Sequence, residues 1–169
     1  MQKSKSLYLY LLLTFFSTFA CCPKVSALSE NQSNAIKDNC STIQESLKNV
    51  QKKDSRTRVY LGGYFETILS KYIKPLNHRL VENSISDINI INEQTEFANA
   101  KTQFSNDFII YQKSLESLIA TNCKENPDDF YDILTTTRAL RATVLSDVMN
   151  LKQLILDHSS SVQLLEEKI

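Results

Sequence analysis

Residues that break helices are scarce in this sequence of 169 residues, which has two glycines and three prolines and lacks tryptophan. Sandwiches and barrels of strands need a turn residue about every eight to twelve positions, so this scarcity argues against them and favours long helices. The 19 basic and 19 acidic side chains balance. The strongest sequence signal for nucleic-acid binding, a markedly basic domain, is therefore also lacking.

Catalytic and metal-binding patterns are equally scarce. His78 and His158 do not have the four-residue spacing of a helical metal site, and we expect both on the surface. The serines at 159–161 lie near His158 only as part of a polar tail. We therefore expect a protein that is not an enzyme and that holds no metal or cofactor.

Residues 1–27 have the pattern of a secretory signal peptide. Lys3 and Lys5 precede an apolar run over residues 7–20, and the small residues at 25–27 resemble a cleavage site. The run of about fourteen residues is shorter than the roughly 20 of a spanning helix, so a permanent signal anchor is the less favoured alternative. Lipid attachment at Cys21 is a second alternative. We expect cleavage after residue 27 and a location outside the cytoplasm, secreted or in the cell envelope.

Cleavage there would change both the charge and the cysteine content. The remaining chain keeps all 19 acidic residues and loses three of the 19 basic ones, so its net charge is −3. It keeps two cysteines, Cys40 and Cys123, which in an exported domain usually form a disulfide. Residues 28–39 are polar and aperiodic, which predicts a flexible leader.

Three later stretches have apolar residues in alternating steps of four and three, the pattern of one helix face. They cover residues 43–68, 97–118 and 130–155. Asn126 and Pro127 predict where the third helix begins. Gly62-Gly63 could interrupt the first helix, and Lys74-Pro75 predicts a kink or short break. Residues 159–169 form a polar tail or an extension of the third helix.

The two cysteines set the packing. Their midpoint in the sequence falls between the first two predicted helices, so antiparallel packing would bring Cys40 and Cys123 together. The sequence therefore predicts an all-α fold over residues 40–158. We expect an elongated, coiled-coil-like antiparallel bundle of three helices in up-down-up order, closed by one disulfide.

One charged residue interrupts the apolar stripe of the first predicted helix, and one interrupts the apolar stripe of the third. These are Asp54 and Arg141, and the offset of 87 residues between them also relates the other positions of the two stripes. Parallel helices that start level would place them in one layer, which predicts an ion pair in a buried polar layer, with Arg58 or Arg138 as substitutes. The alternative is a local rotation that turns both side chains outward.

The first helix also carries a dense basic run. It consists of Lys48, Lys52, Lys53, Arg56 and Arg58. Such a run is most often a solvated helix face, but it is also a candidate face for binding an anion.

Parts of this pattern resemble a group of known proteins. The distinctive positions are Cys40, Gly62, the Pro75-Leu76-Asn77 step, Cys123, Arg138 and Arg141. With the helical stripes over about residues 40–156, they resemble small secreted helical proteins of unknown function from ultrasmall candidate-phylum bacteria of the Saccharibacteria type. The resemblance implies an exported, disulfide-closed bundle and brings no catalytic residue.

These observations predict an exported, non-enzymatic helical bundle that acts as an interaction or structural component outside the cytoplasm. Its partner would be another protein or a component of the envelope, not a nucleic acid, and no membrane span would remain after cleavage. The alternative is a small binding module for an apolar ligand or an anionic cell-surface polymer. A carrier needs a cavity of at least about 300 Å³ beside Phe104 and Phe108, whereas a fully packed bundle has none.

Overall fold

A computed structural model of the chain describes residues 28–85 and 87–167. Within these ranges every regular element is helical, which confirms the predicted all-α class for this part of the chain. The elements are α2 (Glu30–Asp38), α3 (Cys40–Thr67), the π-helical segment η1 (Ile68–Ile73), α4 (Lys74–Glu82), α5 (Ile88–Ala120) and α6 (Pro127–Glu166). The predicted signal peptide, residues 1–27, and the alternative lipidation site Cys21 lie outside the described residues.

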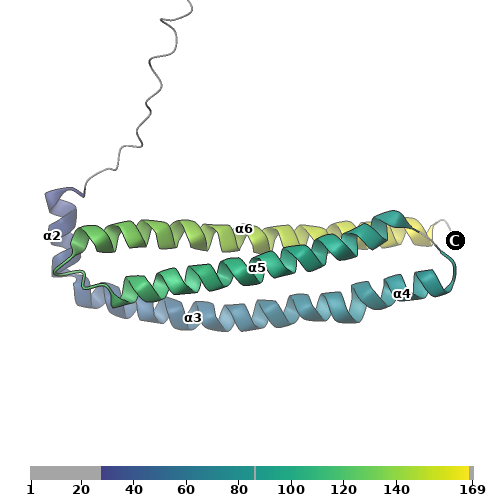
Figure 1. Ribbon diagram of the computed structural model, residues 1–169, viewed down its shortest axis with the longest axis horizontal. Helices are drawn as coiled ribbons and strands as arrows, with labels where there is room; N and C mark the ends of the chain where they lie inside the picture. Colours follow the sequence, from purple (N-terminus) through teal and green to yellow (C-terminus); the bar gives the residue numbers. More distant parts are fainter. Residues whose placement is uncertain (1–27, 86, 168–169) are drawn as a thin grey trace, which may run out of the picture.

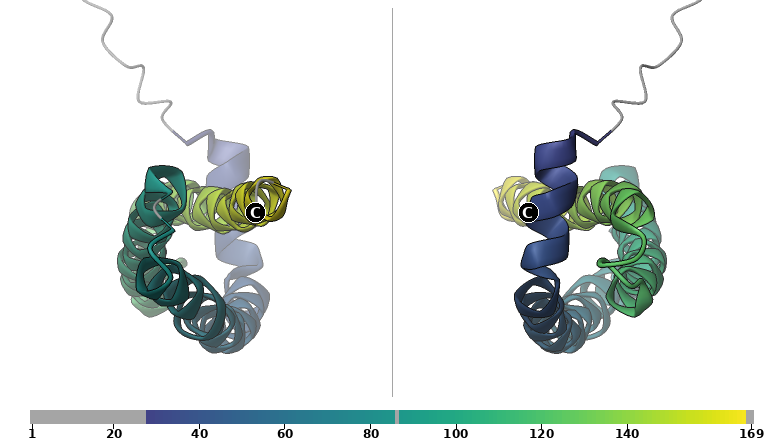
Figure 2. Two further views of the ribbon diagram at one scale, coloured as in Figure 1. Left: turned by 90° about the vertical axis from the view of Figure 1, so that its right-hand side faces the viewer. Right: turned by 90° about the vertical axis from the view of Figure 1, so that its left-hand side faces the viewer.

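The long elements lie side by side as three rods. The first rod consists of α3, η1 and α4 in unbroken succession, α5 runs back beside it, and α6 returns beside α5 (Figure 1). Seen from the end, the rods form an arc with α5 in the middle (Figure 2). The backbone of α5 packs against both α3 and α6, whereas α3 and α6 scarcely approach each other. No described helix is long and apolar enough to cross a membrane.

The helix α5 contributes more buried residues to the core than any other helix. Its buried residues are Ile90, Phe97, Phe104, Phe108, Tyr111, Leu115 and Leu118. Phe65 of α3 is fully buried against this stripe, and its ring meets those of Phe97 and Phe104 edge to face, with centroids 6.3 and 5.6 Å apart. Such pairs add about 0.5 to 1.5 kcal/mol each beyond the burial of their surface. The aromatic seam therefore holds the first rod on α5.

The predicted disulfide between Cys40 and Cys123 is present, with the two Cα atoms 5.6 Å apart. It fixes the start of α3 against the turn between α5 and α6. Beside it, the side-chain amide of Gln44 donates to the carbonyl oxygen of Thr121 at 3.2 Å. Closing a loop of 83 residues stabilises the fold by about 4 to 5 kcal/mol if the effect is purely one of chain entropy.

The kink or break expected at Lys74-Pro75 is replaced by the π-helical segment η1. A proline inside an α-helix lacks the N–H group for one hydrogen bond, and its ring collides with the carbonyl group four residues earlier. In η1 the wider turn lets the N–H of Lys74 bond to the carbonyl oxygen of Leu69, five residues back. The helix therefore accommodates Pro75 without ending.

The prediction of a flexible leader over residues 28–39 is wrong, because residues 30–38 form α2. Ser29 and Gln32 make a capping box: the Ser29 hydroxyl accepts the N–H of Gln32 at 3.3 Å, and the Gln32 side chain accepts the N–H of Ser29 at 3.1 Å. Ile36 packs on the main core. This short helix lies across the Cys40 end of the rods (Figure 2).

The third long helix begins at Pro127, as the Asn126-Pro127 step predicted, and continues to Glu166. The described part of the region 159–169 is therefore a helix extension rather than a polar tail. Leu165, near its end, is buried.

Candidate functional site

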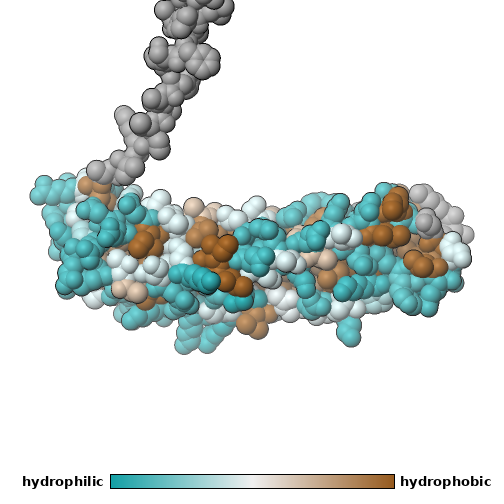
Figure 3. Space-filling model, viewed as in Figure 1, coloured by the Kyte–Doolittle hydropathy of each residue, from teal (hydrophilic) through white to brown (hydrophobic). Residues whose placement is uncertain are grey.

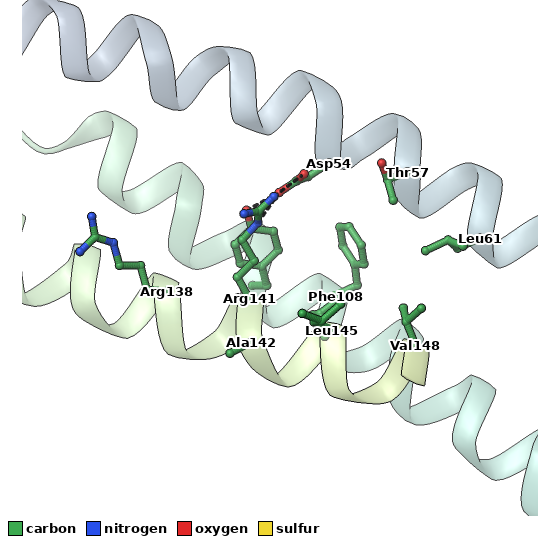
Figure 4. A pocket seen from close by; sticks show the side chains of 11 residues that line it. Asp54, Thr57, Leu61, Phe108, Arg138, Arg141, Ala142, Leu145 and Val148 are labelled. Carbon is green, nitrogen blue, oxygen red and sulfur yellow. Dashed lines mark hydrogen bonds and ion pairs between the residues drawn. The ribbon is translucent and has the colours of Figure 1, made fainter. Parts of the chain in front are cut away.

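An apolar groove lies between α3 and α6 on the open side of the arc, with a volume of about 430 Å³. Phe108 of α5 forms its floor, Leu61 of α3 lines one wall, and Val144, Leu145 and Val148 of α6 line the other (Figure 4). We call it the proximal groove because it lies in the half of the molecule nearer the disulfide. Its volume is within the range of pockets that bind ligands, about 300 to 1,000 Å³.

A polar layer crosses the proximal groove. The guanidinium group of Arg141 donates to both carboxylate oxygens of Asp54, at 3.0 Å from Nε and 3.2 Å from Nη2 (Figure 4). The hydroxyl group of Tyr111 donates to the same carboxylate at 2.6 Å. Asp54 therefore connects α3 to both α5 and α6 at one level.

Burial differs sharply between the members of this layer. Tyr111 is 1% exposed, the Asp54 side chain is 14% exposed and the Arg141 side chain is 60% exposed. Burial, and then the hydrogen bond to Asp54, raises the pKa of the Tyr111 hydroxyl well above its usual value. The hydrogen bond to Asp54 also raises the pKa of Arg141. The layer thus bridges α3, α5 and α6 at the mouth of the groove.

The sequence predicted an Asp54–Arg141 pair on or near the bundle axis, and the structure brings the two residues together with only Asp54 mostly buried. Sequence reasoning missed Tyr111 as the third member, although it lies one helical turn after Phe108 on the same stripe. The two substitute arginines behave differently. Arg58 donates to the side chain of Gln112 at 2.7 Å, and Arg138 extends from α6 beside the proximal groove.

The basic run on α3 divides in two. Lys48, Lys52, Lys53 and Arg56 are exposed. Arg58 is turned towards α5 by its hydrogen bond to Gln112, so its inclusion in one anion-binding face was wrong. The four exposed side chains lie on the outer side of α3 and do not line the proximal groove.

A second groove, of about 540 Å³, lies further along the same side and is called the distal groove here. Ile68 and Tyr72 of η1 line one wall, and Ile155 and Val162 of α6 line the other. The π-helical turn shifts the register of the first rod where it passes this groove. Its charged lining residues are Lys71, Arg79 and Glu166, with His158 as a titratable neighbour.

His158 is largely buried, which corrects the expectation of a surface histidine. Its Nδ1 atom lies 2.8 Å from Glu93 of α5, and Ser161 donates a hydrogen bond to the same carboxylate. A serine nucleophile needs its hydroxyl group aimed at the histidine base, but this hydroxyl is aimed at the glutamate. The arrangement clamps α6 to α5. His78, by contrast, is exposed and lies 3.2 Å from Glu82.

A third groove, of about 480 Å³, lies between α3 and α5, but polar side chains such as Ser55, Arg58 and Gln112 line much of it. On the face that carries α5, apolar areas form separate patches among hydrophilic ones (Figure 3). In the described ranges there is no group of three or more His, Cys, Asp or Glu residues placed to hold a metal ion. The two grooves of the open side are therefore the candidate functional site.

In comparisons with known proteins, the chain matches no protein-family model, no curated protein and no solved structure.

Proposed function

We propose that the chain is an exported, non-enzymatic interaction protein that receives an amphipathic helix of a partner along its open side. In this proposal the three rods act as an elongated up-down-up bundle in which the place of a fourth helix is vacant. The partner is another protein of the cell envelope or of the space outside it. The observation that carries the proposal is the pair of apolar grooves in line between the same two rods.

The dimensions support a helix as the occupant. Helices bind in apolar grooves through residues that recur at steps of three and four along one face. The apolar residues of α6 that line the two grooves extend from Ala142 to Val162, a rise of about 30 Å at about 1.5 Å per residue. An occupant that runs beside α6 over this length would contact Phe108 in one groove and Ile155 in the other.

The rims of the open side also favour a macromolecule. Leu145, Met149 and Leu156 expose apolar surface along α6, and Tyr64 does so on α3, one turn after Leu61. Exposed apolar side chains that gather along one edge of a protein, unlike single scattered ones, mark an interaction surface. A small ligand inside one groove would leave most of these side chains in water.

Photocrosslinking on the exported protein in its own cell tests this proposal. The crosslinking amino acid p-benzoyl-phenylalanine is introduced at Leu145, on the groove wall, or at Leu164, which is equally apolar and exposed but faces away from both grooves. We expect an adduct of one discrete mass from position 145 and none from position 164. Equal labelling from both positions, or no adduct from position 145, would contradict the proposal.

A second candidate function is a small binding module for an apolar ligand, because the proximal groove reaches the volume that a carrier needs. Titration with cis-parinaric acid, a fluorescent fatty acid, checks this. Saturable binding of one molecule per chain that is abolished by Val148→Trp, which fills the groove, would support the carrier. Weak binding without a fixed stoichiometry would leave the helix-binding function as the better account.

A further inference from the structure

The charges that line the open side indicate the chemistry of its occupant. Arg138 and Arg141 lie at the proximal groove, and Lys71 and Arg79 lie at the distal groove. Among the acids at these grooves, Asp54 is already bound to Arg141, which leaves Glu166. Basic side chains therefore predominate at both ends of the open side.

The charges of three of these basic side chains are available to pair with a bound partner. Arg138, Lys71 and Arg79 are exposed, and none of them takes part in an ion pair within the described residues. The surroundings make this excess unusual, because residues 28–169 contain all 19 acidic residues of the chain and three fewer basic ones. A basic strip on a stretch of chain with a net charge of −3 is a local feature of this side, not a consequence of composition.

We infer that the helix received by the open side is acidic, with carboxylates flanking an apolar face of about 20 residues. This inference rests on the proposed function. The apolar face would meet Phe108, Leu145 and Ile155, and the flanking carboxylates would approach Arg138 at one end and Lys71 at the other. Complementary charge at the rim of an interface mainly speeds association and selects the partner.

Two synthetic peptides of 20 residues test the inference. Both carry the same leucine face and one tryptophan; one has glutamate and the other lysine at the positions flanking that face. The protein contains no tryptophan, so excitation at 295 nm reports on the peptide alone. We expect the glutamate peptide to bind at least tenfold more tightly at low salt. The difference should shrink as salt screens the exposed charges.

Charge-removing variants locate the effect. Arg138→Gln and Lys71→Gln together should weaken the glutamate peptide three- to tenfold and leave the lysine peptide unchanged or improved. Lys52→Gln with Lys48→Gln is the matched control, because it removes two exposed positive charges from the outer side of α3. An equal loss in the control would mean that the peptide binds by non-specific attraction, which would overturn the inference.

The remaining outcomes distinguish failure of the acidic-helix inference from failure of the proposed helix-binding function. Equal binding of both peptides, with both weakened by Leu145→Glu, would preserve a helix-binding groove and overturn its acidic partner. Failure of both peptides would count against the helix-binding function itself. Two other occupants would also overturn the inference of an acidic helix. A second copy of the chain would appear as a dimer in sedimentation that Leu145→Glu dissociates. A lipid surface would appear as displacement of the peptide by phosphatidylglycerol vesicles but not by phosphatidylcholine vesicles.

Discussion

Arg141 on α6 donates hydrogen bonds to both carboxylate oxygens of Asp54 on α3, and within the described ranges no other ion pair joins these two helices. Because Tyr111 also donates to Asp54, the carboxylate is shared by three helices. The two partners of the ion pair differ in burial, with Asp54 mostly buried and Arg141 mostly exposed. The energetic consequences of removing them should differ accordingly.

Asp54→Ala should destabilise the fold more than Arg141→Met. Removing Asp54 leaves the buried hydroxyl group of Tyr111 without its acceptor, at a cost of about 1 to 3 kcal/mol. Removing the exposed Arg141 should cost about 0 to 1 kcal/mol. Urea unfolding followed by circular dichroism measures both, with Asp132→Ala as an exposed control. Because Asp54→Ala removes both interactions, an equal cost of the two variants would show that the ion pair and not the Tyr111 hydrogen bond dominates this layer.

The sequence predicted a pair between Asp54 and Arg141 from their offset of 87 residues. The two side chains meet because α3 and α6 start at nearly the same level. The open side could not be predicted in the same way. A helix shows an apolar stripe whether it packs on one neighbouring helix or on two. The apolar stripes of α3 and α6 therefore do not reveal whether these two helices touch each other. Leu145 illustrates this, since it adjoins the buried stripe residue Val144 but is 62% exposed.

Local features with weak apolar signals were also hard to predict. The helix α2 has few apolar residues, but its Ser29–Gln32 capping box was visible in the sequence. The π-helical turn at η1 takes the place of the expected kink or break before Pro75, and the sequence pattern does not distinguish these three ways of accommodating a proline. Burial of His158 follows from a carboxylate on another helix, Glu93, and spacing along a single helix does not disclose such a partner.

Gly62→Ala and Gly63→Ala should each stabilise the protein by about 0.5 to 1 kcal/mol. Both glycines lie inside α3, where alanine is preferred for its lower loss of backbone entropy. Apart from its chain neighbours and the nearby backbone of its own helix, a Cβ atom at either position would meet no atom within 4 Å, so no clash opposes the gain. Thermal unfolding of the two single variants and the double variant measures it. A loss of stability would show that the glycines permit a close approach absent from the described structure.

Asp147→Asn should stabilise the protein at neutral pH. Burial, and then the nearby Asp107, raises the pKa of Asp147, and its buried Oδ2 atom has no hydrogen-bond partner in the described part of the chain. Because the folded state holds this proton more tightly than the unfolded state, stability should fall as pH rises through the window between the unfolded and the raised folded pKa. An asparagine removes that loss and can donate to Asp107, for a gain of about 1 kcal/mol at pH 7.

Unfolding in urea at pH 3 and pH 7 checks the sign of this effect. The advantage of Asp147→Asn over the parent should be largest at pH 7 and small at pH 3, where the parent aspartate is also protonated. Asp132→Asn, on the exposed side of α6, serves as the control. An advantage that is independent of pH would show that removal of charge is not its cause.

Export, which we propose, should be accompanied by cleavage, and the mature protein should begin at Leu28. Cleavage after residue 27 follows from the small residues at 25–27, and it leaves Ser29 in place to cap α2. N-terminal sequencing of exported material decides the position. A lipid-modified Cys21 at the N-terminus would instead show a tethered protein, and an intact N-terminus in membranes would show a signal anchor.

Loss of the disulfide should loosen one end of the molecule before it changes the rest. Cys40 is the first residue of α3, and only Asn39 separates it from α2, so without the bond to Cys123 the short helix loses its fixed attachment point. The double variant Cys40→Ser with Cys123→Ser should lower the free energy of unfolding by up to about 4 to 5 kcal/mol, because the unfolded chain regains the entropy of an open loop. Limited proteolysis should then cut first near residues 28–39, whereas the aromatic seam around Phe65 keeps the rods packed further from the disulfide.

Mass spectrometry of the non-reduced parent, expected to be two hydrogen atoms lighter than the reduced form, confirms the starting state. Simultaneous cleavage throughout the chain would show that the fold unfolds as a single unit and that the disulfide does not act locally.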